Sequence, residues 1–146
     1  MSTAAKAGIA ALVLLAIAGL TMLFMHFWMA PPDDLDLSRE KPSANKVYTV
    51  AVAPEQEPFD RNTLHAWIAT VKAADGSPVD DAKISVDGGM PQHGHGLPTA
   101  PAVTEALGEG RYRIEGVRFN MSGWWELKLH VSAAAGEDDV TFNLDL

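Results

Sequence analysis

A run of 23 residues near the N-terminus, from Ala7 to Met29, contains no Asp, Glu, Lys or Arg. As an α-helix this run is roughly 35 Å long, which is enough to cross a hydrocarbon core of about 30 Å. The apolar region of a signal peptide usually has only about 7–15 residues and ends at a small-x-small cleavage site. Here Phe27, Trp28 and Met29 occupy the positions where small residues would be needed. We therefore expect residues 1–30 to form a retained transmembrane anchor.

The charges that flank the run predict its orientation. Lys6 precedes it, whereas Asp33, Asp34 and Asp36 follow it. Because positive residues favour the cytoplasmic side, the N-terminus should lie in the cytoplasm. The expected location is a single pass through the inner (cytoplasmic) membrane, with the C-terminal part in the periplasm or on the outer face.

The composition after the run excludes several classes of function. Residues 31–146 carry 10 basic and 19 acidic side chains, a net charge of −9. Nucleic-acid binding requires clustered Lys and Arg, so we expect no nucleic-acid partner. The chain has no cysteine, which excludes thiolate metal sites and thiol redox chemistry.

The residues between the anchor and the first regular pattern are polar. Residues 31–45 contain three prolines, six charges and only two large apolar residues. This composition predicts an extended linker.

From Lys46 onward, apolar residues recur with a period of two, which is the signature of β-strands. In "WWELKLHV", Trp125 should point inward with Leu127, whereas Trp124 and His130 should point outward. Turn signals such as "ADGSP" and "LGEG" separate the strands, and "LGEG" predicts a tight hairpin. The pattern predicts an all-β fold over residues 46–146, an immunoglobulin-like antiparallel β-sandwich of six or seven strands. The predicted strands lie in "VYTVAVA", "TLHAWIATV", "KISVD", "RYRIE", "WWELKLHV" and "VTFNLDL".

The segment "GGMPQHGHGLP", residues 88–98, is the most unusual loop of the chain. His93 and His95 lie two positions apart, and Met90 lies three residues before His93. Met121 follows in another connection, and the connections of a sandwich gather at its two ends. Imidazole and thioether ligands suit Cu(I), and two imidazoles also suit Cu(II). The sequence thus indicates a copper site with His93 and His95 as principal ligands and Met90 or Met121 as the soft addition.

A purely structural interpretation of these residues remains open. Gly, Pro and His are common in solvated loops, and Met90 and Met121 could fill gaps in the core. His65, in a central strand, is expected to be partly buried and hydrogen-bonded.

The order of motifs between residues 90 and 129 resembles the YtkA-like domain, a family of small exported or membrane-anchored bacterial β-sandwiches. The matching elements are Met90-Pro91, His93-Gly94-His95-Gly96, Gly110-x-Tyr112, Gly116-x-x-Phe119, Met121-x-Gly123 and Trp125-Glu126-Leu127. The resemblance implies an immunoglobulin-like fold and a link to copper handling.

No motif of an enzyme is present: the chain lacks G-x-S-x-G, H-E-x-x-H and a phosphate-binding glycine loop. We therefore expect no catalytic activity. Two hypotheses follow. One is a membrane-anchored extracytoplasmic domain that binds or delivers copper. The other is a metal-free interaction domain that supports assembly of a membrane complex with another periplasmic or membrane protein.

Overall fold

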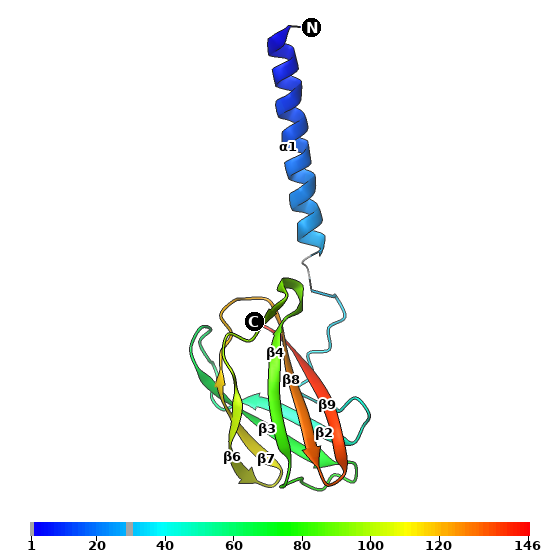
Figure 1. Ribbon diagram of the computed structural model, residues 1–146, viewed down its shortest axis with the longest axis vertical. Helices are drawn as coiled ribbons and strands as arrows, with labels where there is room; N and C mark the ends of the chain where they lie inside the picture. The colour runs from blue at the N-terminus through cyan, green and yellow to red at the C-terminus, as the bar shows by residue number, and fades with distance from the viewer. Residues whose placement is uncertain (1, 29–30) are drawn as a thin grey trace. The chain divides into compact units, whose positions relative to one another are not determined.

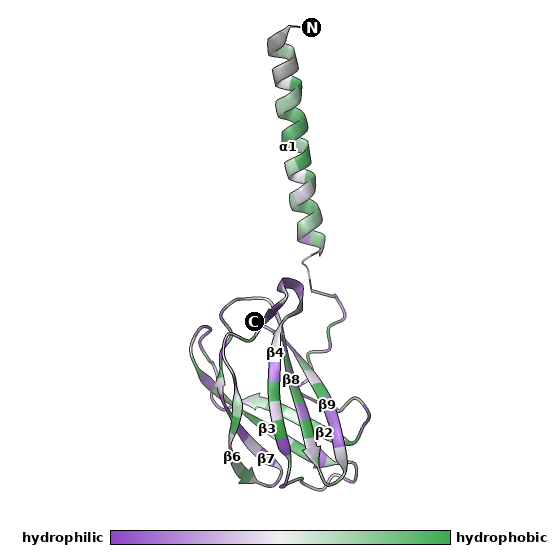
Figure 2. Ribbon diagram, viewed as in Figure 1, coloured by the Kyte–Doolittle hydropathy of each residue, from purple (hydrophilic) through white to green (hydrophobic). Residues whose placement is uncertain are grey.

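The computed structural model describes residues 2–28 and 31–146 and divides the chain into two compact units, Met1–Asp33 and Asp34–Leu146. The first unit contains helix α1, Thr3–Trp28. Within α1, Gly8–Phe27 is long and apolar enough to cross a membrane, and its residues are exposed. Figure 2 shows this apolar surface along the helix. The Thr21 hydroxyl donates to the Ile17 carbonyl at 2.8 Å, so this polar group is satisfied within the helix.

The second unit is an antiparallel β-sandwich that is nearly closed (Figure 1), which confirms the predicted fold class. Its strands follow the order β1-β2-β3-β7-β6-β4-β8-β9, and β5 pairs with β4. A single residue pair, Ser85 with Ala102, joins β4 to β6, so the strands form two layers. The strands are β1 Glu40–Pro42, β2 Tyr48–Pro54, β3 His65–Ala73, β4 Lys83–Met90, β5 His95–Gly96, β6 Ala102–Gly108, β7 Arg111–Val117, β8 Trp124–Ala133 and β9 Gly136–Asp145.

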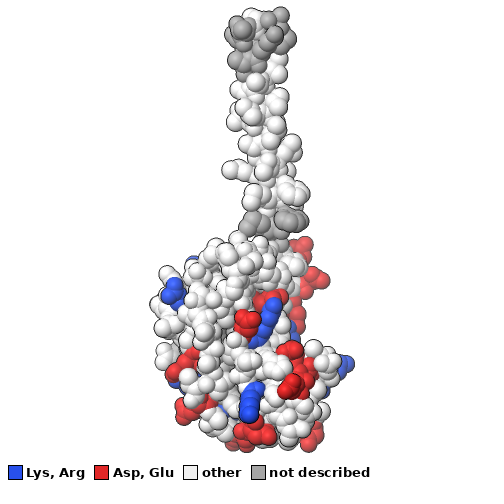
Figure 3. Space-filling view, viewed as in Figure 1, with Lys and Arg blue, Asp and Glu red and all other residues white. Residues whose placement is uncertain are grey.

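The core lies between the two layers and follows the predicted alternation. Along β8, Trp125, Leu127, Leu129 and Val131 are buried, whereas Trp124 is only half-buried. The predicted register is therefore correct, because a shift of one residue would bury the charged face of the strand. Figure 3 shows acidic and basic side chains spread over one face of the β unit. The largest fully buried side chains are Trp67, Trp125, Tyr48, Phe119 and Phe142.

The predicted hairpin at "LGEG" is present between β6 and β7. Glu109 and Gly110 both have positive φ angles, 56° and 72°, as a two-residue hairpin turn that follows the twist of its strands requires. A Cβ atom on Gly110 would lie 2.3 Å from the Val71 carbonyl oxygen, so this position accepts only glycine.

The predicted linker over residues 31–45 differs from the structure in its second half. Glu40–Pro42 form β1, which pairs with β2, and Ser43 is only 2 % exposed. The Ala44 amide donates to the Asp139 carbonyl at 2.8 Å. Residues 40–44 thus connect β2 to β9, the two edges that the sandwich would otherwise leave unpaired. The polar composition of this segment concealed its role because short edge strands need few apolar residues.

Strand β6 was also absent from the predicted set. Its residues, "AVTEALG", show no clear alternation and are mostly exposed. The pairing with β7 shifts register twice, so bulges interrupt the period of two on which the prediction depended.

Candidate functional site

The loop that follows β4 is a tight hairpin. Pro91–His93 form one turn of 3-10 helix, Gly94 adopts the left-handed conformation with φ 63°, and His95 returns to pair with Met90. Gly89 enables this close return, because a Cβ atom there would lie 2.0 Å from the His95 carbonyl oxygen. The backbone conformation of this hairpin therefore determines the positions of His93 and His95.

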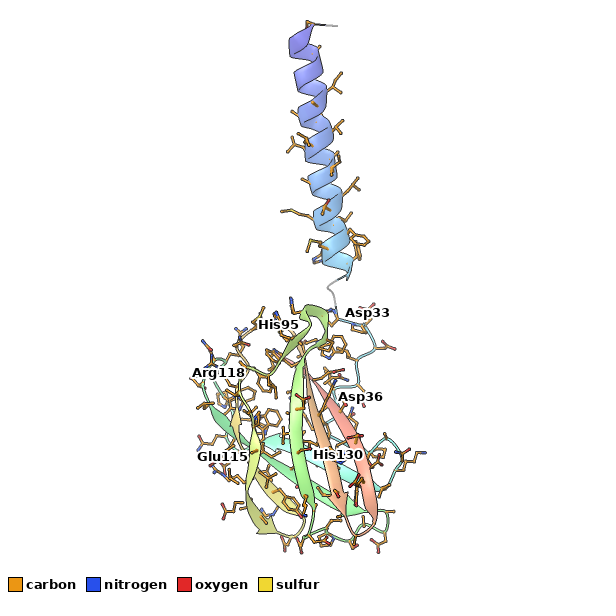
Figure 4. The ribbon with its side chains drawn as sticks, in the orientation of Figure 1. Asp33, Asp36, His95, Glu115, Arg118 and His130 are labelled. Carbon is orange, nitrogen blue, oxygen red and sulfur yellow. The ribbon has the colours of Figure 1, made fainter. Side chains whose placement is uncertain are left out.

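The hairpin places the two imidazole rings side by side. The ring centroids of His93 and His95 are 5.6 Å apart, and the ring planes differ by 15°. His93 is half-buried and His95 is exposed, so solvent reaches the pair. Figure 4 shows His95 at the end of the sandwich. The turn at Gly94, rather than an extended segment, brings the rings together.

A second loop, Phe119–Gly123, connects β7 to β8 and carries Met121. Trp125 Nε1 donates to the Met121 carbonyl at 3.1 Å, which ties the loop to the core. Gly123 exchanges two backbone hydrogen bonds with Leu146, of 2.7 and 3.1 Å. The Met121 side chain is 38 % exposed and therefore available to a ligand.

Met90 lies in the core beneath the hairpin 91–96 and the loop 119–123. Its side chain is only 1 % exposed, and its terminal methyl carbon would lie 3.4 Å from a Cβ atom on Gly123. Met90 thus fills the core below both loops, which is the packing role that the structural interpretation gave it. Of the four predicted ligands, the structure brings His93 and His95 together, leaves Met121 accessible, and buries Met90.

The two loops themselves supply few kinds of metal ligand. Among the described residues, no group of three or more His, Cys, Asp or Glu side chains is placed to hold a metal ion. The segments 88–104 and 119–125 contain no Asp, Glu, Lys or Arg. Within these two segments, the imidazole and thioether groups are the side chains suited to a soft metal ion.

His130 lies away from this end, on the outer face of β8 (Figure 4). Its Nδ1 is 2.8 Å from Asp139 Oδ1, and its Nε2 is 3.9 Å from Glu137 Oε2. The two carboxylates thus meet opposite sides of the ring and cannot share one ion with it. This outward position confirms the prediction made from the strand period.

His65 is partly buried, as predicted, but only one of its ring nitrogens is satisfied. Trp67 Nε1 donates to His65 Nδ1 at 3.0 Å, whereas the buried Nε2 has no hydrogen-bond partner in the described part of the chain. Burial lowers the pKa of His65 below its usual value of 6.5. The sequence offered no signal for this unpaired nitrogen, because Phe119, which packs against the ring, belongs to a distant segment.

Comparisons with known proteins agree with the motif order. The family model described as YtkA-like matches residues 42–130. The search of curated proteins and the search of solved structures found no match. An N-terminal apolar helix followed by this domain indicates a membrane-anchored or exported protein. The matched range covers more than half of the chain and most of the sandwich, and the chain therefore belongs to the YtkA-like family.

Proposed function

We propose that this protein is a membrane-anchored extracytoplasmic domain that binds copper at the end of the sandwich formed by the loops 91–96 and 119–123. The observation that carries the proposal is the pair of accessible, nearly parallel imidazole rings of His93 and His95, 5.6 Å apart. A rigid hairpin holds both rings, so little conformational entropy would be lost when they bind an ion.

The ligand types favour Cu(I). Two imidazoles with the Met121 thioether form a soft set of low coordination number, which Cu(I) accepts. Zn(II) requires four ligands as a rule, and neither loop supplies a carboxylate or a thiolate. Met90 is excluded from the proposed ligand set because its side chain is buried.

The membrane orientation belongs to the same proposal. Lys6 precedes the apolar span Gly8–Phe27, and acidic residues follow it, so the positive-inside rule places the sandwich outside the cytoplasm. In a bacterium with two membranes this is the periplasm, with α1 in the inner membrane.

The test is a Cu(I) competition titration of the full chain in detergent micelles against a chromophoric chelator. We compare the wild type with His93→Ala/His95→Ala and with the control His130→Ala, which removes an imidazole from a distant face. The double variant should bind Cu(I) at least about tenfold more weakly, which corresponds to a loss of about 1.4 kcal/mol of binding free energy. His130→Ala should match the wild type.

Equal affinity of the wild type and the folded double variant would contradict the copper proposal. In that case the remaining function is a metal-free assembly domain, for which the burial of Met90 and the hydrogen bonding of Gly123 to Leu146 provide a rigid end surface. Neither function requires catalysis, and we propose that the protein is not an enzyme.

A further inference from the structure

His65 lies at the start of β3, and its hydrogen bond with Trp67 requires the neutral form of the imidazole. Trp67 Nε1 donates to His65 Nδ1 at 3.0 Å. An indole nitrogen can only donate, so Nδ1 must present a lone pair and the ring proton must lie on Nε2. The observed contact therefore requires neutral His65.

The described surroundings of the ring offer no hydrogen-bond acceptor to its buried nitrogen. Nε2 is buried and has no acceptor among the residues that the structure describes. The ring packs against Phe59 and Phe119, at centroid distances of 4.5 and 5.5 Å, and these two rings also contact each other. Protonation of His65 would place a hydrogen on Nδ1, where it would face the N–H of Trp67. Both ring nitrogens of His65 would then be donors without an acceptor.

The charged groups near His65 do not compensate for this loss. Arg113 is bonded to Glu55 through two hydrogen bonds of 2.8 Å and forms an ion pair with Glu115. Burial is the cause of the lowered pKa of His65, with no contribution from a neighbouring charge. The charged residues of the segments around the ring are Glu55, Glu57, Asp60 and Arg61 before β3, Arg113 and Glu115 on β7, Arg118 after β7, and Arg39 over the Trp67 ring.

The neutral ring holds two segments against the sandwich. The Asn62 amide, in the loop of residues 55–64, donates to the Phe119 carbonyl at 2.7 Å. Phe59 of the same loop contacts both His65 and Phe119. Two hollows of about 380 and 270 Å³ border His65, which gives the ring space to move outward.

We propose that His65 is a proton-operated latch, which in its neutral form holds the loop 55–64 against Phe119 and on protonation releases it. The released form is the one in which the imidazolium reaches water. This inference goes beyond the proposed function and does not depend on a metal.

The test uses the full chain in detergent micelles without copper. Amide exchange of the Asn62 N–H is measured at pH 7.5 and pH 5.5 and corrected for the intrinsic exchange rate at each pH. We assume that His65 titrates near 6.5 in the open form and takes up no proton in the closed form. The equilibrium constant for opening should then increase about tenfold from pH 7.5 to pH 5.5. In His65→Gln, whose amide oxygen can accept from Trp67 without titrating, opening should not change with pH. His130→Gln is the matched control and should behave as the wild type does.

A second measurement keeps the test decisive if His65→Gln does not fold. Ring resonances of wild-type His65, followed by NMR, should titrate below pH 6.5. Protection of the Asn62 amide that is independent of pH, or a His65 ring that titrates at or above 6.5 while the loop stays closed, would overturn the latch.

Discussion

The indole nitrogen of Trp125 donates a hydrogen bond of 3.1 Å to the backbone carbonyl of Met121. The ring of Trp125 is only 1 % exposed, and it contacts Phe119 edge to face at 5.2 Å. The side chain of Trp125 thus packs in the core of the sandwich and also holds the loop that carries the exposed Met121. Stability and the geometry of the candidate site depend on the same residue.

Replacement of Trp125 should therefore be far more damaging than replacement of its neighbour. Trp125→Ala leaves a large cavity and should cost about 3–5 kcal/mol of unfolding free energy. Trp124 is half-buried, and its Nε1 donates to Asn143 Oδ1 at 3.0 Å. Trp124→Ala should cost much less, because the Asn143 amide can bond to water at the surface. Urea unfolding of both variants measures the difference, and equal losses would show that the register of β8 is wrong.

The hairpin that holds the imidazoles should depend on Gly89 but not on Gly96. A Cβ atom on Gly89 would lie 2.0 Å from the His95 carbonyl oxygen, a backbone atom that cannot move aside alone. A Cβ atom on Gly96 would lie 3.8 Å from the Gly88 carbonyl oxygen, which is an ordinary contact. Gly89→Ala should lower the melting temperature and weaken Cu(I) binding, and Gly96→Ala should change both only slightly.

The measurements for this pair are a thermal melt and the Cu(I) competition titration. If Gly89→Ala keeps wild-type stability and affinity, then the close return of His95 does not position the site.

Asp138 should make the fold sensitive to acid. Burial by itself raises the pKa of Asp138, but hydrogen bonds from Ser43, Asp139, Val47 and Asn45 outweigh it, and the net pKa is well below the usual 3.8. The unfolded chain therefore takes up a proton at higher pH than the folded chain does. The stabilisation is complete above about pH 5 and decreases as pH falls through the unfolded pKa of 3.8 towards the lower folded pKa.

Asp138→Asn should thus lower the melting temperature at pH 7 and reduce its decrease between pH 4 and pH 2. Asp145→Asn, on an exposed position of the same strand, is the control and should leave both unchanged. Thermal melts across this pH range measure the effect. A variant with the same acid dependence as the wild type would show that other carboxylates dominate.

The apolar helix should remain attached in the mature protein. The span Gly8–Phe27 is longer than the apolar core of a typical signal peptide. The residues directly before Pro31 do not form a small-x-small cleavage site, because Trp28 occupies one of the two positions that need a small residue. Mass spectrometry of the protein from the membrane fraction should find α1 still joined to the sandwich. A mature N-terminus near Pro31 would contradict this prediction.

Much of this protein follows from local sequence pattern. The period of two predicted the inward faces of β2, β4, β7, β8 and β9, because alternation decides which face of a strand enters the core. The run without charges predicted a helix of membrane-spanning length, because length and polarity are sufficient for that inference. The glycines of "LGEG" predicted a hairpin, since glycine adopts the positive φ angles of such a turn without steric cost. The order of motifs between residues 90 and 129 indicated the family.

Only the tertiary structure decided what depends on segments that are distant in the chain. Residues 40–44 became part of the sandwich because two edges, β2 and β9, meet there. Met90 enters the core, with its terminal methyl group next to Gly123, 33 positions later. His65 packs against Phe59 and Phe119, and its buried Nε2 has no hydrogen-bond partner among the described residues. Sequence periodicity specifies the direction of a side chain along its own strand, whereas burial, ligand access and protonation are set by neighbours that only folding brings together.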